Sequence, residues 1–367
     1  MSATKDIRLM KGNEAFAEGI IRAGCDGYFG YPITPQSEVL EYLSAQKTKE
    51  RTGMVVLQAE SEIASIHMVY GGAGCGKRVV TSSSSPGISL MQEGFSYLAG
   101  TELPCLLMNV MRGGPGLGTI QPSQSDYFQA VKGGGHGDYK MIVLAPASVQ
   151  EMYDFAKLGF DLAFKYRIQV MILSDGAIGQ MMEKVELDEQ LPRLTDEEII
   201  KKYPWATTGK TNDRERNIVT SLDLNPVKQE IMNRKLQEKF KEIEENEVRF
   251  ESFECDDAEY LFVAYGSSAR VCEKSVQLGR AKGIKIGLLR LITLFPFPYD
   301  EVARLAKQVE GILTIEMSAG QMIEDVKLGA NGAVRIEHYG RLGGIMPAPA
   351  EVLNVLEENF INTKIYV

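Results

Sequence analysis

The sequence predicts an α/β protein whose main domain is a parallel sheet with helices on both faces. Short apolar runs alternate with helical patterns from residue 13 to residue 175, and a second alternation of the same kind begins at Tyr260. Strands that alternate with helices along a chain form parallel sheets covered by helices. The length of 367 residues also exceeds the usual size of a single hydrophobic core, so we expect two domains.

The first alternation contains apolar runs of strand length with helical patterns between them. The expected buried strands are 27–31, 54–57, 78–81, 104–110, 141–144 and 168–173. The expected helices are 36–46, 60–71, 86–98 and 148–164. Ser85 is expected to cap the third helix with Pro86 in its first position, because a serine oxygen accepts a backbone hydrogen bond there and proline needs no donor.

A charged segment separates the two alternations and sets the expected domain limits. It contains apolar residues at helical spacing, which predict an amphipathic helix packed on the domain surface rather than a dedicated partner-binding helix. These residues are Val227, Ile231, Leu236, Phe240 and Ile243. We therefore expect a first α/β domain over residues 1–185, a connector over 186–257 and a smaller α/β domain over 258–367.

Composition excludes several classes of protein. The net charge of -9, without a cluster of Lys and Arg, argues against a nucleic-acid-binding protein. No apolar run reaches the roughly 20 residues that cross a membrane, and the N-terminus lacks a signal-peptide core, so we expect a cytoplasmic protein. The five cysteines have no CxxC spacing, which disfavours zinc ribbons and iron-sulfur clusters on this chain.

The segment 29–38, FGYPITPQSE, is the first candidate binding element. Pro32 and Pro35 each fix φ and remove an N–H donor, so neither the preceding strand nor the following helix can continue through them. The segment is therefore a rigid loop that presents Thr34 in a nearly preset orientation. Such a loop usually holds a ligand, whose identity these residues alone do not give.

The glycine-rich stretch 111–126, MRGGPGLGTIQPSQSD, is the second candidate. It places Arg112 at the carboxyl end of a predicted strand, where open α/β sheets bind their ligands. The guanidinium group suits a carboxylate, and the following glycines allow close approach to the backbone. A structural ion pair is the alternative role for Arg112.

Two acidic residues, Glu60 and Glu62, open the second predicted helix. A helix N-terminus favours negative charge, so a structural role is sufficient to explain them. A catalytic carboxyl at this position is the alternative.

Taken in order, the motifs GYPITP, ESEIAS, TSSSSPG, the strand ending in Arg112, LAPASVQE and LSDGAIGQ resemble the 2-oxoacid:ferredoxin oxidoreductases. These thiamine diphosphate enzymes oxidise 2-oxo acids to acyl-CoA. The resemblance implies a pyrimidine-binding domain, and the tail with its LFPFP segment resembles the C-terminal domain of transketolases. The stretch 113–139 is most similar to the subunit that acts on 2-oxoisovalerate, with 2-oxoglutarate and pyruvate as alternative substrates.

The resemblance also implies roles for individual residues. Glu62 would bind the aminopyrimidine ring of the cofactor and should be buried, with Glu60 as the alternative in register. Thr34 and Arg112 would bind the substrate. Further cofactor contacts are expected at Pro32, Ile33 and Ser85.

Two motifs of a complete enzyme of this kind are missing from the sequence. Asp-Gly occurs only in CDG and SDG, so no Gly-Asp-Gly motif is present to hold magnesium and diphosphate, and no cluster-ligand spacing occurs. The resemblance implies that a β-type partner subunit holds Mg²⁺ and diphosphate. The iron-sulfur clusters would lie on γ-type and ferredoxin-like subunits, with coenzyme A as co-substrate and ferredoxin as acceptor. A non-redox thiamine enzyme subunit and a non-catalytic scaffold subunit are the rival functions.

Overall fold

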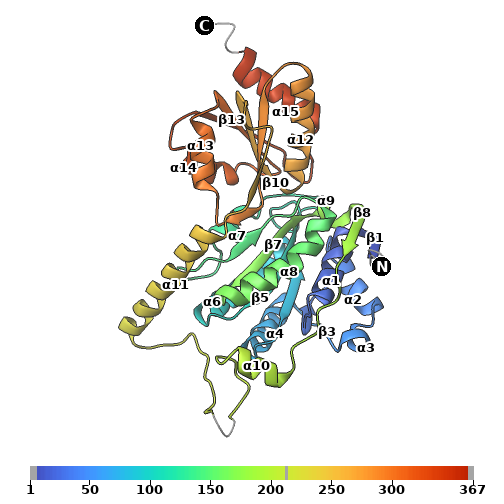
Figure 1. Cartoon of the computed structure of the whole chain (residues 1–367), viewed down its shortest axis with the longest axis vertical. Coiled ribbons are helices and arrows are strands. Elements are labelled where there is room, and N and C mark those ends of the chain that lie inside the picture. The colour runs from blue at the N-terminus through green and yellow to red at the C-terminus, as the bar shows by residue number, and fades with distance from the viewer. Residues whose placement is uncertain (1–5, 211–213, 363–367) are drawn as a thin grey trace, which may run out of the picture.

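The structure is a computed structural model that describes residues 6–210 and 214–362. Its larger body is built on a seven-stranded sheet in the order β12-β6-β7-β5-β4-β2-β3 (Figure 1). The six strands from the first half of the chain pair parallel with one another. They are β2 (Gly27–Gly30), β3 (Val55–Gln58), β4 (Val79–Ser83), β5 (Cys105–Met111), β6 (Ile142–Leu144) and β7 (Gln169–Asp175). All six were predicted from their apolar runs. The prediction that the run 54–57 is buried was wrong, because β3 is an edge strand with Val55 and Leu57 exposed.

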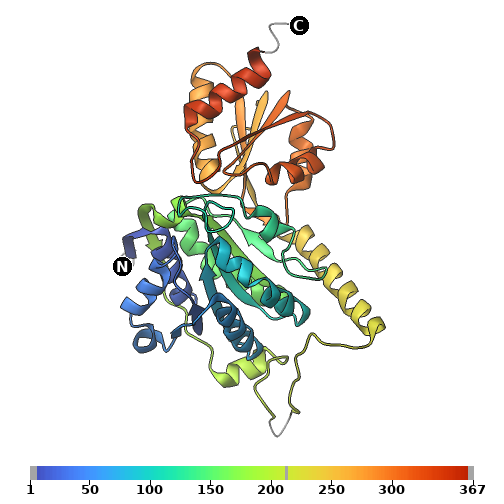
Figure 2. The ribbon, with the colours of Figure 1, turned by 180° about the vertical axis from the view of Figure 1, so that it is seen from behind.

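Helices cover both faces of this sheet, as Figures 1 and 2 show from opposite sides. The pair α1 and α8 covers one face, and α4 and α6 cover the other, which confirms the predicted fold class. The longer helices are α1 (Gly12–Arg22), α2 (Glu38–Ala45), α4 (Glu62–Gly74), α6 (Gln92–Gly100) and α8 (Val149–Tyr166). The shorter helices are α3 (Thr48–Thr52), α5 (Ser85–Leu90), α7 (Tyr127–Val131) and α9 (Gly176–Gln180).

The helix expected over residues 86–98 is divided into α5 and α6, which meet at Met91. The side chain of Met91 is fully buried in the core. The expected cap is also shifted by one residue. Ser84 has extended backbone angles and precedes the helix, whereas Ser85 is the first helical residue. The prediction of Ser85 as the cap was therefore wrong, and its hydroxyl is free for other partners.

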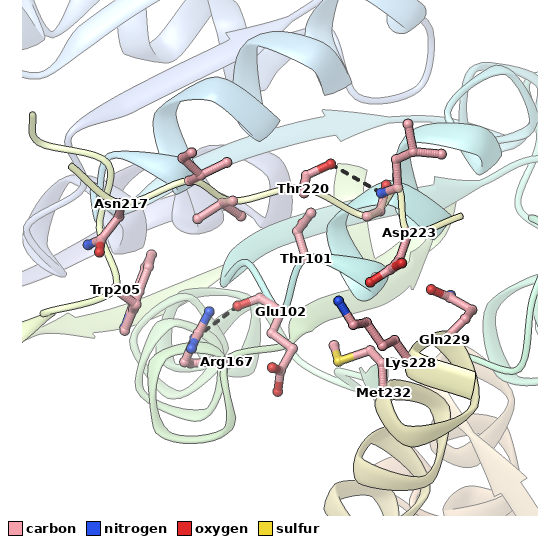
Figure 3. A pocket seen from close by; sticks show the side chains of 15 residues that line it. Thr101, Glu102, Arg167, Trp205, Asn217, Thr220, Asp223, Lys228, Gln229 and Met232 are labelled. Carbon is pink, nitrogen blue, oxygen red and sulfur yellow. Dashed lines mark hydrogen bonds between the residues drawn. The ribbon is translucent and has the colours of Figure 1, made fainter. Parts of the chain in front are cut away.

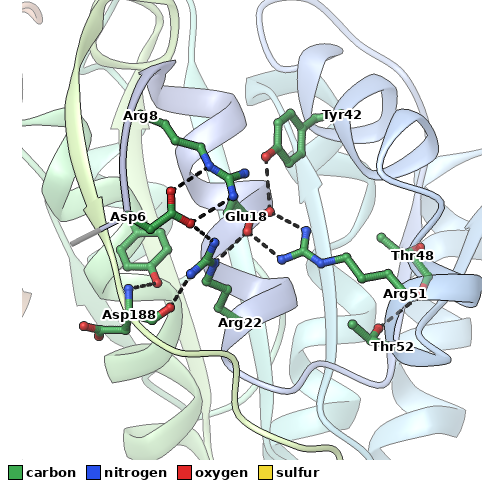
Figure 4. Close-up of polar contacts among 10 residues, drawn as sticks. Asp6, Arg8, Glu18, Arg22, Tyr42, Thr48, Arg51, Thr52 and Asp188 are labelled. Atoms are coloured by element: carbon green, nitrogen blue, oxygen red, sulfur yellow. Dashed lines mark hydrogen bonds and ion pairs between the residues drawn. The ribbon is translucent and has the colours of Figure 1, made fainter. Parts of the chain in front are cut away.

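An antiparallel ribbon that the sequence did not predict joins β1 (Asp6–Lys11) to β8 (Met182–Leu187). A buried ionic cluster lies beside it (Figure 4). The Glu18 carboxylate, fully buried on α1, accepts hydrogen bonds from Arg22 and Arg51, each at 2.7 Å, and from the Tyr42 hydroxyl at 3.1 Å. Burial alone would raise the pKa of Glu18, but the two guanidinium groups outweigh it and lower the pKa.

The connector contains α10 (Asp196–Lys202) and the long helix α11 (Pro226–Asn246). The second half of α11 packs on the domain as predicted, with Leu236, Phe240 and Ile243 buried. Its first half does not, since Val227 and Ile231 are each 63% exposed. The prediction was wrong there because the first half of α11 extends away from the sheet (Figure 1).

The smaller body is a five-stranded sheet in the order β14-β13-β10-β11-β9. Its strand β9 lies inside the segment expected to be connector and pairs antiparallel with β11. The strands are β9 (Phe250–Phe253), β10 (Tyr260–Tyr265), β11 (Ile286–Leu291), β13 (Gly311–Glu316) and β14 (Arg335–Gly340). The helices are α12 (Gly266–Ala281), α13 (Tyr299–Ala306), α14 (Met322–Ala330) and α15 (Pro349–Leu356), and a π-helical turn follows at Glu357–Ile361.

One strand of the second half leaves this sheet. β12 (Thr293–Phe295) pairs antiparallel with β6 and forms an edge of the larger sheet. The two bodies are thus joined by strand pairing as well as by side-chain contacts. Among the described residues, no helix has the length and apolar character needed to cross a bilayer.

Candidate active site

The predicted substrate-binding residues lie at the carboxyl ends of parallel strands. The segment with Thr34 follows β2, and Arg112 directly follows β5. Ser85, predicted as a cofactor contact, follows β4. Since parallel strands end at the same edge of a sheet, the topology brings these three residues together.

Arg112 is 7% exposed and has no acidic partner among the described residues. Its Nη1 donates to the Thr34 carbonyl at 3.0 Å and its Nη2 donates to the Leu117 carbonyl at 3.1 Å. The Nε atom is buried without an acceptor. A structural ion pair is therefore not what holds this guanidinium, and its positive charge is left to attract an anion.

The loop with the two prolines is fixed from within the protein. The side chain of Gln36 is fully buried, donates to the Tyr31 carbonyl at 3.2 Å and accepts the Ser82 hydroxyl at 2.6 Å. Thr34 itself is exposed and contacts Arg112 through its carbonyl oxygen rather than its hydroxyl. The remaining predicted loop contacts, Pro32 and Ile33, are half-buried.

Ser85 connects Arg112 to two residues that the sequence analysis missed. The Ser85 hydroxyl accepts the Arg112 backbone N–H at 3.1 Å and donates to Asp126 Oδ2 at 2.6 Å. Asn109 Nδ2 donates to the same oxygen at 2.9 Å, and Asn109 Oδ1 accepts the Ser85 N–H at 3.1 Å. Burial raises the pKa of Asp126, against the opposite effect of these two hydrogen bonds. A signal for Asn109 existed, since it is a polar residue inside an apolar strand.

A cavity of about 420 Å³ on another part of the molecule is lined by none of the predicted residues (Figure 3). It lies between the connector and the turns that precede β5 and β7. There the Arg167 guanidinium lies 4.6 Å from the Trp205 ring centre, and its Nε donates to the Glu102 carbonyl at 3.1 Å. Its wall from Thr220 to Asp223 is exposed connector, so we do not assign it to the active site.

The cavity of about 730 Å³ at the boundary of the two domains is the candidate active site. Ser85, Arg112 and Asp126 line it from the first domain, and residues after β13 and β14 line it from the second. The volume lies in the range of small-molecule sites. Its lining residues are Ser85, Pro86, Ser89, Arg112, Gly113, Gly114, Pro115, Gly116, Ser123, Ser125, Asp126, Met317, Ala319, Gln321, Leu342 and Gly343.

Glu62 lies outside this cavity, on the other side of α5. It is 6% exposed, whereas Glu60 is exposed, so the structure buries the residue that the resemblance favours. Its carboxylate has no hydrogen bond or ion pair among the described residues. A Cβ on Gly87 would lie 2.6 Å from Glu62 Oε1 and 2.1 Å from Ser83 Oγ. Only glycine at this position of α5 leaves room for the carboxylate.

Comparisons with known proteins place the chain in a family. Residues 18–251 match the family described as pyruvate flavodoxin/ferredoxin oxidoreductase, thiamine diphosphate-binding, and residues 258–352 match core domain II of pyruvate:ferredoxin oxidoreductase. The chain is 49% identical to ketoisovalerate oxidoreductase subunit VorB of Methanothermobacter thermautotrophicus, over 96% of this chain and 97% of that protein. It is 36% identical to 2-oxoglutarate synthase subunit KorA of Methanocaldococcus jannaschii, over 94% and 98%.

Among solved structures, 2-oxoglutarate:ferredoxin oxidoreductase from Magnetococcus marinus aligns with a TM-score of 0.82 at 27% identity. The alignment covers 96% of this chain, which spans 65% of the length of the solved chain. An inactive split-gene transketolase aligns with a TM-score of 0.57 at 11% identity, which shows a likeness of fold alone. From the two family matches and the full-length relatives, the chain belongs to the 2-oxoacid:ferredoxin oxidoreductase family.

Proposed function

We propose that this chain is the subunit of a 2-oxoisovalerate:ferredoxin oxidoreductase that binds the 2-oxo acid and the pyrimidine half of thiamine diphosphate. The observation that carries this proposal is the uncompensated Arg112 in a cavity at the ends of the strands. A buried guanidinium without an acidic partner favours an anionic ligand, and the carboxylate of a 2-oxo acid is such a group. The relatives named for ketoisovalerate support the same substrate.

The lining of the cavity supports a branched apolar substrate over 2-oxoglutarate. Arg112 is the one basic residue among the described residues that line it. A dicarboxylate would need a second cation, whereas an isopropyl group would contact Pro86, Pro115, Met317 and Leu342. The 2-oxoglutarate and pyruvate enzymes remain the alternatives within the family, supported by the relatives named for 2-oxoglutarate.

The residues around Glu62 fit the aminopyrimidine of thiamine diphosphate. The hydroxyls of Ser83 and Ser84 are buried without a partner among the described residues. The Glu62 carboxylate and the Ser83 hydroxyl approach the same side of Gly87. A bound cofactor would supply the carbon nucleophile that attacks the 2-oxo group. Glu62 would share a proton with the pyrimidine ring, and Arg112 would hold the substrate carboxylate. Ser85 would keep Arg112 in place through its backbone N–H.

The rest of the enzyme is proposed to lie on partner subunits. The described residues contain no group of three or more His, Cys, Asp or Glu side chains that could hold a metal ion. A β-type subunit would hold Mg²⁺ and the diphosphate. Iron-sulfur clusters on γ-type and ferredoxin-like subunits would pass electrons to ferredoxin, coenzyme A would take the acyl group, and the complex would be cytoplasmic.

Exposed apolar side chains in loops beside the strand ends support a partner surface there. Leu117, which is 84% exposed, and Ile120 lie in the loop after β5. Leu342 and Ile345 follow β14, and Ile63 lies in the first turn of α4 beside Glu62. Clustered exposed apolar residues are typical of protein interfaces.

The test is anaerobic purification of the tagged chain with its partners, followed by CoA-dependent viologen reduction. We expect reduction with 2-oxoisovalerate, and weaker or no reduction with 2-oxoglutarate and pyruvate. A preference for 2-oxoglutarate or pyruvate would assign that acid as the substrate and keep the chain in the same family. Decarboxylation without need of CoA or an electron acceptor would instead favour a non-redox thiamine enzyme, and a complete complex without activity would favour a scaffold.

A further inference from the structure

Within the described part of the chain, Asp126 holds one carboxyl oxygen in hydrogen bonds and leaves the other without a partner. Oδ2 accepts hydrogen bonds from the Ser85 hydroxyl at 2.6 Å and from Asn109 Nδ2 at 2.9 Å. Oδ1 has no partner among the described residues, and Asp126 is part of the cavity wall. Because both donors occupy Oδ2, a proton on this carboxyl would reside on Oδ1.

No cation of the first domain forms an ion pair with Asp126 among the described residues. From α5, Ser85 and Ser89 line the cavity and carry no charge. From the end of β5, Arg112 lines the same cavity, but its guanidinium is bound to the carbonyls of Thr34 and Leu117 and forms no ion pair with Asp126.

Two tyrosines near Asp126, Tyr265 of the second domain and Tyr127 of α7, stay neutral and add no positive charge. The pKa of Tyr265 is raised well above its usual value, so its hydroxyl stays neutral. Burial is the largest cause, and the negative charges of Glu316, Asp175 and Asp126 add to it. On α7, the Tyr127 hydroxyl donates away from the cavity to a buried carboxylate of α14 at 2.7 Å. Nothing among these groups favours a second anion beside a bound 2-oxo acid.

We propose that Asp126 takes a proton from solvent when the 2-oxo acid binds and donates it, from Oδ1, in a hydrogen bond to the substrate carboxylate. Arg112 supplies the positive charge for that carboxylate, and Asp126 supplies a neutral donor. An ionised Asp126 would repel the substrate, so binding and protonation are coupled. Since the 2-oxo acid is taken as the occupant of the cavity, this inference rests on the proposed function.

The experiment measures substrate binding by the purified complex from about pH 5.5 to about pH 9. KM for 2-oxoisovalerate and the inhibition constant of 3-methylbutanoate, which lacks the oxo group, are determined for the native complex. Above the pKa of Asp126 both constants should rise by about tenfold per pH unit, because one proton is bound with each ligand. In Asp126→Asn the side chain is neutral at every pH and still donates, so both constants should stay flat across the pH range.

Asp154→Asn is the matched control. Burial also raises the pKa of Asp154, but this residue lies on α8 and does not line the cavity. Its variant should keep the pH dependence of the native complex.

Two results would overturn the inference. One is an Asp126→Asn complex whose constants rise with pH as steeply as those of the native complex. The other is a variant with unchanged binding and a kcat lowered by about 100-fold or more, which would make Asp126 a base in the chemistry.

If the variant does not assemble, proton uptake is measured on the native complex instead. Binding of 3-methylbutanoate is followed by calorimetry in two buffers of different ionisation enthalpy. Uptake of about one proton supports the inference, and no uptake overturns it. If the native complex oxidises no 2-oxo acid, the proposed function fails. If the native complex is active but its KM and inhibition constant do not change with pH, the role of Asp126 is overturned and the proposed function is not.

Discussion

Gln124 of the first domain and Met317 of the second are joined by two hydrogen bonds. The Gln124 N–H donates to the Met317 carbonyl at 2.9 Å, and the Met317 N–H donates to Gln124 Oε1 at 2.9 Å. Gln124 Nε2 also donates to the Tyr265 carbonyl at 2.8 Å, and its Oε1 accepts the Ser268 hydroxyl at 2.6 Å. Since Met317 and Ser123 line the cavity, this junction forms part of the site's floor.

Replacing Gln124 by Ala should lower the free energy of unfolding by about 3 kcal/mol, because it leaves several buried backbone and hydroxyl groups without partners. The urea midpoint, followed by circular dichroism, measures the loss. Gln277→Ala, at an exposed position of α12, is the control and should cost less than about 0.5 kcal/mol. An equal effect of both changes would show that Gln124 does not hold the domains together.

Replacing Glu62 by Gln should lower turnover by about 100-fold or more while the complex stays assembled, because the amide keeps the shape but cannot take up a proton. Viologen reduction measures activity and gel filtration measures assembly. Glu60→Gln, on the exposed neighbour, should retain activity. If Glu60→Gln is inactive and Glu62→Gln is active, Glu60 rather than Glu62 is the residue that binds the aminopyrimidine ring.

Replacing Arg112 by Lys should raise KM for the 2-oxo acid by roughly 10- to 100-fold, because an ammonium group cannot contact two carbonyls and a carboxylate as a planar fork does. Steady-state kinetics of the purified complex measure the change. Arg304→Lys, at an exposed position of α13 outside the cavity, should leave KM unchanged. An unaltered KM in Arg112→Lys would remove this residue from substrate binding.

The lowered pKa of Glu18 predicts a pH-dependent stability. A carboxylate whose folded pKa is lowered stabilises the protein above the ordinary Glu pKa of about 4.3, and this contribution is lost as the pH falls through the folded value. Glu18→Gln should therefore be less stable by about 3 kcal/mol near pH 7, because two partly buried guanidinium groups lose their counter-charge.

The stability difference between native protein and Glu18→Gln should narrow below about pH 4.3. Chemical unfolding at several pH values measures it. Glu230→Gln, in an exposed pair with Arg234, should show a small difference at every pH. If the difference in unfolding free energy between the native protein and Glu18→Gln is the same at every pH, the effect comes from packing rather than from charge.

The buried parallel strands were predictable because each is a continuous apolar run, and the residues at their ends could be named for the same reason. Strands at the margins were not. Both strands of the β1 and β8 ribbon carry charged residues, and they lie far apart in sequence. The strand β12 pairs with a strand about 150 residues earlier, a partner that no local pattern indicates.

In the site, Arg112 and Glu62 could be placed at element boundaries from the sequence, but the groups around them could not be predicted. Asp126 and Asn109 were missed as site residues because their role depends on Ser85, which a different strand brings to them. The need for glycine at position 87 was hidden as well. It arises from the closeness of α5 to the carboxylate on α4, which is a property of packing.

The pairing of β12 with β6 has a consequence for synthesis of the chain. The other six strands of the larger sheet leave the ribosome well before β12 does. The sheet is therefore complete only after residue 295 has been released. Until then the edge of β6, at Ile142–Leu144, offers unpaired backbone groups to any other strand. A chain cut near residue 250 would keep this edge open permanently, and we expect it to self-associate where the full-length chain does not.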